Sequence, residues 1–164
     1  MLDKDQEKVY VDVLLESLER KLKLMHNLMS LTKDQEEILT SEKPDAGALD
    51  TTFDMKEMYI SQMLEIDEGF QNVYDRVADE VRQNRYQHRP KIERMQQLIR
   101  EITALGMSVQ ALEEQNRQRF EQFLVQEKKE IKSFKVSNKT AASYYRNMAN
   151  QPAAGQSYFL NSQK

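Results

Sequence analysis

A stripe of apolar residues, spaced by alternating steps of four and three, constrains this chain more than any other feature. Its members are Val11, Leu15, Leu18, Leu22, Met25 and Met29, with Leu39 resuming the register. This spacing places them on one face of an α-helix and is typical of a coiled-coil-like seam. Further residues widen the stripe, namely Leu14, Leu24, Leu28, Leu31 and Ile38. We therefore predict a helix that packs against more than one neighbour, unlike the strands of a simple zipper.

Two more helices follow from the same kind of pattern. The second stripe holds Ile60, Met63, Phe70, Tyr74, Val77 and Val81, and the third holds Met95, Leu98, Ile102, Leu105, Val109 and Leu112. With only 4 Gly and 3 Pro, the chain lacks the turn residues that an all-β fold requires. We predict an all-α fold, an antiparallel three-helix bundle within residues 1–135. Its long coiled-coil-like helices are expected near residues 7–41, 51–86 and 90–135, and a C-terminal tail follows at 136–164.

The connections are predicted from breaker residues. Residues 41–52 contain a Pro and a Gly and have no helical period, so Thr51 with Asp54 is the expected cap of the second helix. Residues 82–89 precede Pro90, which favours a tight turn. A single kinked helix is the alternative, because the heptad phase continues through this stretch. Gly69 interrupts the second helix at a cost of roughly 1 kcal/mol, which is tolerated if neighbouring residues pack closely at that point.

The third predicted helix is the longest and outruns the other two by about 15 Å, at about 1.5 Å per residue. The overhang and the tail carry the candidate partner-binding residues, which are Phe120, Phe123, Ile131, Phe134, Tyr144, Tyr145, Met148, Phe159 and Leu160. We expect the shorter helices to leave these residues without an apolar neighbour. Exposed apolar patches usually mark a protein-binding surface, most simply a groove for an amphipathic helix. The alternative is a tail that docks on the bundle.

Charge is divided unevenly along the chain. The first 80 residues hold 9 basic and 20 acidic residues, whereas the last 84 hold 15 basic and 7 acidic ones. A basic half can mark a nucleic-acid-binding protein, but these basic residues are spread among Glu and Gln along a helical pattern. We therefore predict that the basic late part packs against the acidic early part, and we expect no nucleic-acid partner.

The residue types that carry enzyme chemistry are scarce. The chain has no Cys, and its two His residues are His26 and His88. The lack of Cys excludes a thiolate nucleophile and a Cys-based metal site, and two His residues argue against a His-rich metal site. Glu65, Asp67 and Glu68 stand together, but a solvated helix face is the favoured interpretation, because a hard cation needs oxygens that converge from a loop. We expect no catalytic, cofactor-binding or metal site, and thus no enzyme.

The sequence also predicts where the protein acts. The opening residues MLDKDQEKVY lack the apolar core of a secretory signal. The longest strongly apolar stretch, residues 102–112, has about half the length that a membrane span needs. We expect a cytoplasmic protein without membrane insertion. Its nine Met residues keep a chaperone function open, because thioether side chains adapt to several related apolar partners.

Three stretches of the sequence resemble the FlgN-type flagellar export chaperones of Gram-positive bacteria. They are YVDVLLESLERKLKLMHNLMSLTKDQEEIL, MYISQMLEIDEGFQNVYDRV and KTAASYYRNMANQPAAGQSYFLNSQK. The resemblance implies a cytoplasmic helical chaperone that holds hook–filament junction (hook-associated) proteins unpolymerised and delivers them to the flagellar export gate. It also implies that the C-terminal part recognises the partner. The similarly small FliT-type chaperones share this pattern, so both types stay open at this point.

A second class of function competes with the chaperone. Long amphipathic helices also build structural coiled-coil adaptors and self-associating helical bundles. An adaptor has no need of an aromatic-rich C-terminal end, whereas a chaperone that shields a partner's apolar helix does. The aromatic residues of the tail therefore favour the chaperone.

Overall fold

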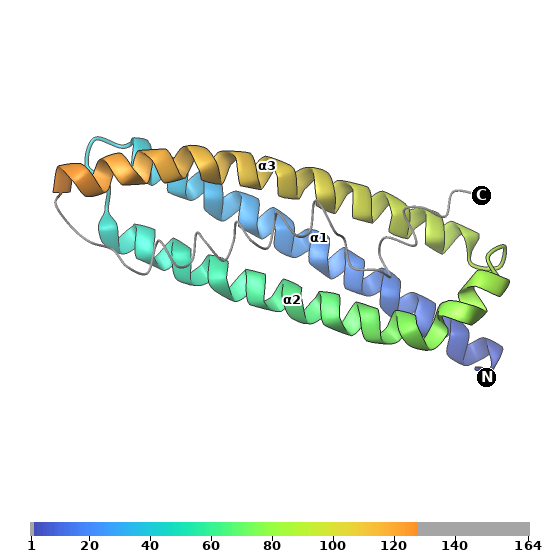
Figure 1. The fold of residues 1–164 in the computed structure, drawn as a ribbon. Coiled ribbons are helices and arrows are strands. Elements are labelled where there is room, and N and C mark those ends of the chain that lie inside the picture. Colours follow the sequence, from blue (N-terminus) through green and yellow to red (C-terminus); the bar gives the residue numbers. More distant parts are fainter. Residues whose placement is uncertain (1, 128–164) are drawn as a thin grey trace.

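The computed structural model describes residues 2–127, and these residues form three long helices. They are α1 (Lys4–Thr40), α2 (Ala46–Gln83) and α3 (Arg89–Glu127). Consecutive helices run in opposite directions, and α1 lies alongside both α2 and α3 (Figure 1). The predicted all-α antiparallel three-helix bundle is confirmed. We call the end with the α1–α2 connection the distal end, and the end with the α2–α3 turn the proximal end.

Helix α1 is the central element of the bundle. It packs closely against both α2 and α3 along its length. Among the described residues, no Cα atom of α2 comes within 8 Å of a Cα atom of α3. The wide apolar stripe of the first helix thus has the predicted explanation, since its two sides face two different neighbours.

Two aspartates set the starts of α1 and α2. Asp3 accepts a hydrogen bond from the Gln6 backbone N–H (2.8 Å), and the Gln6 side chain accepts one from the Asp3 N–H, which forms a capping box. Asp45 caps α2 by accepting from the N–H groups of Gly47 and Ala48. The predicted cap at Thr51 is wrong. Asp45 satisfies the free N–H groups first, so α2 begins at Ala46 rather than near residue 51.

The connection between α2 and α3 is the predicted turn. Helix α2 ends at Gln83, turn residues follow, and α3 begins at Arg89, directly before Pro90. The backbone N–H of Gln87 donates to the Asn84 carbonyl (3.1 Å), and the His88 N–H donates to the Arg85 carbonyl (3.2 Å). The alternative of a single kinked helix is thereby excluded.

The three helices are nearly equal in length within the described residues, at 37, 38 and 39 residues. Helix α2 gains a turn at its start relative to the prediction. The third helix therefore overhangs α2 less than we expected up to Glu127, because α2 begins earlier, and the last part of α3 extends past the start of α2 (Figure 1).

Apart from Leu31 and Ile66, the buried apolar residues of the described chain form two separate clusters. The main cluster fills the bundle from the proximal end to beyond its middle, and includes Leu18, Leu28, Ile60, Phe70, Met95, Ile102 and Val109. The distal cluster consists of Leu49, Phe53, Phe120 and Phe123, with Ile38, Leu39, Ala46 and Leu124 packed against it. Burial of these side chains supplies most of the stability of such a bundle.

Charged pairs tie α1 to both neighbours. Lys91 of α3 pairs with Asp12, and Arg119 of α3 pairs with Glu36 at 3.2 Å. These pairs join the basic late part to the acidic early part, as predicted. Buried Lys21 of α1 pairs with Asp67 of α2 at 2.6 Å. Of the three neighbouring carboxylates Glu65, Asp67 and Glu68, Asp67 thus has a structural role.

Gly69 lies on an exposed part of α2. A Cβ atom added there would meet no atom of residues 2–127 within 4 Å. Close packing within the described residues therefore does not explain this glycine.

Candidate partner-binding end of the bundle

In the distal cluster, two aromatic residues near the end of α3 pack against the start of α2. The rings of Phe53 and Phe120 meet edge to face, with centroids 5.9 Å apart and an interplanar angle of 86°. Phe123 lies one turn further along α3, with its ring centroid 6.0 Å from that of Phe120. Edge-to-face aromatic pairs add about 0.5–1.5 kcal/mol beyond the burial of their area. The cluster thus fastens the end of α3 to the start of α2.

Two predicted partner-binding residues belong to this cluster. Phe120 is fully buried and Phe123 is 6% exposed. The expectation that they lack an apolar neighbour is wrong, because the early start of α2 brings Leu49 and Phe53 against them. Val125, two residues after Phe123, is 77% exposed. The other predicted residues lie outside the described residues, and they are Ile131, Phe134, Tyr144, Tyr145, Met148, Phe159 and Leu160.

Sequence reasoning missed the α2 half of this cluster. Leu49 and Phe53 stand four residues apart, a helical spacing, but they fell in a stretch interpreted as a connection and its cap. The signal that could have found them was Asp45 followed by this spacing, since Asp is a favoured N-cap residue.

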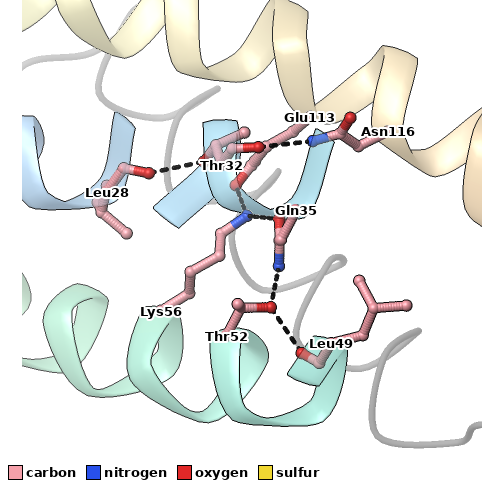
Figure 2. A network of polar contacts seen from close by, with 8 residues as sticks. All are labelled: Leu28, Thr32, Gln35, Leu49, Thr52, Lys56, Glu113 and Asn116. Carbon is pink, nitrogen blue, oxygen red and sulfur yellow. Dashed lines mark hydrogen bonds and ion pairs between the residues drawn. The ribbon is translucent and has the colours of Figure 1, made fainter. Parts of the chain in front are cut away.

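A layer of buried polar side chains separates the distal cluster from the main cluster (Figure 2). Each helix contributes two of its six members, which are Thr32 and Gln35, Thr52 and Lys56, and Glu113 and Asn116. We call these six residues the polar layer. On α3, the layer lies between Val109 of the main cluster and Phe120 of the distal cluster. The interior of the bundle is therefore not continuously apolar.

Hydrogen bonds join the polar layer across the helices. Gln35 links α1 to α2, because its Nε2 donates to Thr52 Oγ1 (3.0 Å) and its Oε1 accepts from Lys56 Nζ (3.2 Å). Asn116 of α3 donates to the backbone carbonyl of Thr32 at 3.0 Å. The hydroxyl groups of Thr32 and Thr52 donate to carbonyls of their own helices. These bonds offset the cost of burying polar groups.

The ion pair between Lys56 and Glu113 is the charged part of the layer. Both side chains are 6% exposed, and the pair bridges α2 and α3 directly (Figure 2). Burial raises the pKa of the Glu113 carboxyl, while the charge of Lys56 acts in the opposite direction. The Lys56 ammonium group contacts Glu113 Oε1, so the attraction within the pair offsets part of the cost of removing both charges from water.

At the proximal end, a second buried polar group ties the turn to α1. Glu7 Oε1 lies 2.8 Å from His88 Nε2, and Asn84 Nδ2 donates to both Glu7 oxygens at 3.2 and 3.3 Å. This arrangement positions the α2–α3 turn. Within residues 2–127, no three His, Cys, Asp or Glu side chains are grouped as a metal ion would require. No helix in the described part of the chain is long and apolar enough to cross a membrane.

Comparisons with known proteins give one finding. The model of the FlgN protein family matches residues 2–152 of this chain. Neither the comparison with curated proteins nor that with solved structures gave a match. The matched range covers all three helices and continues beyond α3.

Proposed function

The chain belongs to the FlgN family of flagellar export chaperones, and from this premise we propose that it binds hook–filament junction (hook-associated) proteins in the cytoplasm. By holding them, it prevents their assembly before export and delivers them to the export gate. The family is one of chaperones rather than enzymes, and membership supports the chaperone over the adaptor considered from the sequence. The observation that carries this proposal is the extent of the family match, since it spans the whole bundle and residues 128–152.

The proposed binding surface begins at the distal end. Phe120 and Phe123 lie in the last turns of the described α3, directly before the stretch that holds the remaining candidates. That stretch contributes Ile131, Phe134, Tyr144, Tyr145, Met148, Phe159 and Leu160. Their aromatic and aliphatic side chains suit an amphipathic helix of the partner, which needs apolar anchors at helical spacing. This location is consistent with a chaperone that covers the helix through which its partner polymerises.

Partner binding at Phe120 and Phe123 has a structural requirement. Both side chains are buried against α2 in the free protein. We propose that a partner first contacts the chain beyond α3 and reaches these rings only when the distal cluster opens. A bound state that replaces Phe53 with partner side chains keeps the rings covered and loses little apolar burial.

Gel filtration of the purified chain, with and without a hook-associated protein from the same organism, tests the function. We expect the two proteins to elute together as a complex of the summed mass. Titration calorimetry then gives the affinity. The matched control is Tyr86→Ser, which removes an 88% exposed aromatic ring at the opposite end of the bundle.

The control variant should bind like the unaltered chain, because Tyr86 belongs to the α2–α3 turn, at the end of the bundle opposite Phe120 and Phe123 (Figure 1). Absence of a complex with every hook-associated protein of the organism would reject the proposed partner class. A clear loss of affinity in Tyr86→Ser would instead indicate that the binding surface lies at the proximal end.

A further inference from the structure

The two apolar clusters differ in size and are divided by the polar layer. Among residues 2–127, the distal cluster has 4 buried apolar residues, whereas the main cluster has 17. Opening the distal cluster alone exposes a small fraction of the apolar area that global unfolding exposes. The free energy of such a local opening is correspondingly lower, as is general for subregions with few buried contacts.

The polar layer weakens the connection between the clusters. Replacing a buried ion pair by well-packed apolar side chains is often neutral or stabilising, because desolvation of the charges offsets their attraction. Lys56 and Glu113 fill the place where apolar side chains would join Ile60 and Val109 to Phe53 and Phe120. When α3 separates from α2 at this level, water solvates both charges, and this solvation lowers the free energy of opening. An apolar layer would gain nothing of this kind.

We propose that the polar layer is a boundary at which the bundle opens: the distal cluster separates as a unit while the main cluster stays packed. Opening exposes Phe53, Phe120 and Phe123. The functional consequence, that the opened cluster admits the exported partner, rests on the proposed function above. The opening itself is a property of the free chain and is tested without any partner.

Single cysteines report the opening, because the chain has no Cys of its own. Leu49→Cys places a thiol in the distal cluster, and Leu28→Cys places one in the main cluster just across the polar layer. Both leucines are fully buried, so the two variants are matched. Under native conditions with excess aromatic disulfide reagent, we expect Leu49→Cys to react about 100-fold faster or more than Leu28→Cys.

A third reporter separates cluster opening from fraying of the first turn of α2. Phe123→Cys lies on α3, so it reacts at a rate similar to Leu49→Cys when the cluster opens as a unit. Labelling of Leu49→Cys alone would overturn the proposal, because it would show that only the start of α2 frays. Far-UV circular dichroism confirms that each variant is folded.

The role of the layer is tested by making it apolar. Lys56→Met with Glu113→Leu, introduced into both leucine reporters, is expected to reduce the ratio of their rates by about tenfold or more. The control is Arg117→Met with Glu114→Leu, which removes an exposed ion pair on α3. This control should leave the ratio unchanged.

Equal labelling of the two leucine reporters in the unaltered background would overturn the proposal, and so would a ratio that the apolar layer does not change. Should a reporter variant fail to fold, amide hydrogen exchange of the unsubstituted chain supplies the same comparison. We then expect faster exchange in residues 117–125 than in residues 95–109, and equal protection would reject the boundary. A failed binding assay leaves these outcomes unaffected, so the opening and the proposed function fail separately.

Discussion

His88 Nε2 lies 2.8 Å from Glu7 Oε1, and this buried contact joins the α2–α3 turn to the first turns of α1 across 81 residues of sequence. Asn84 donates to the same carboxylate. One side chain of α1 thus serves two residues of the turn. Because all three groups are buried or partly buried, loss of the carboxylate leaves polar groups without their partner.

We predict that Glu7→Ala destabilises the protein by about 1–3 kcal/mol, the usual cost of leaving a buried donor unsatisfied. Thermal unfolding followed by circular dichroism measures the effect. Asp5→Ala, which removes an exposed carboxylate from the same turn, is the control and should shift the melting temperature much less. Equal shifts in both variants would indicate a general charge effect at the start of α1.

Gly69→Ala is predicted to stabilise the protein by about 0.4–1 kcal/mol, because the new methyl group enters open space and Ala restricts the unfolded chain. The midpoint of urea unfolding should rise. The reverse substitution Ala104→Gly, at an exposed position of α3, is the control and should lower it by a similar amount. A lower midpoint for Gly69→Ala would mean that another molecule approaches α2 there.

The raised pKa of Glu113 predicts a pH dependence of stability. The folded chain holds the proton of this carboxyl more tightly than the unfolded chain does. Its contribution to the free energy of unfolding therefore rises as pH falls from above the folded pKa towards the ordinary value of 4.5, and falls as pH rises through the folded pKa. Glu113→Gln removes this titration.

We expect the free energy of unfolding of the unaltered chain, minus that of Glu113→Gln, to increase as pH falls from neutral towards 4.5. Urea unfolding at several pH values measures it, and contributions from the other carboxylates cancel in the difference. The opposite trend would mean that the attraction of Lys56 outweighs desolvation and holds the pKa of Glu113 below its usual range.

Deletion of residues 137–164 tests the C-terminal part of the proposed binding surface. We expect the melting temperature to change little and the affinity for a hook-associated protein to fall about tenfold or more, since a few apolar anchors usually carry most of the binding energy. A large drop in melting temperature would show instead that the deleted stretch is a structural part of the bundle. An increase in affinity would identify it as a competitor of the partner.

The sequence predicted the helices better than their ends. The four-and-three spacing in α1 and the width of its stripe were sufficient for a central helix with two neighbours, because periodicity is a local property of the chain. Pro90 and the polar residues before it were sufficient for the turn. The start of α2 was predicted near residue 51 instead of at Ala46. Asp45 and Thr51 both offer a side-chain acceptor for an N-cap, and only the folded chain shows which one is used.

The polar layer had a weak signal in the sequence. Asn116 stands in the register of the third stripe, and Thr32 stands in that of the first, so both helices mark the same level with a polar residue. Lys56 and Glu113 gave no signal, because in one helix taken alone they are indistinguishable from residues of a solvated face.

By itself, the sequence determined that the chain forms three amphipathic helices, in which order they occur and which face of each is apolar. The tertiary structure alone decided which polar residues are buried and whether Phe120 is covered. The physical reason is that helical periodicity depends on residues three and four apart, whereas burial depends on what another helix brings alongside. Here the early turns of α2 brought Phe53 to Phe120 and Lys56 to Glu113.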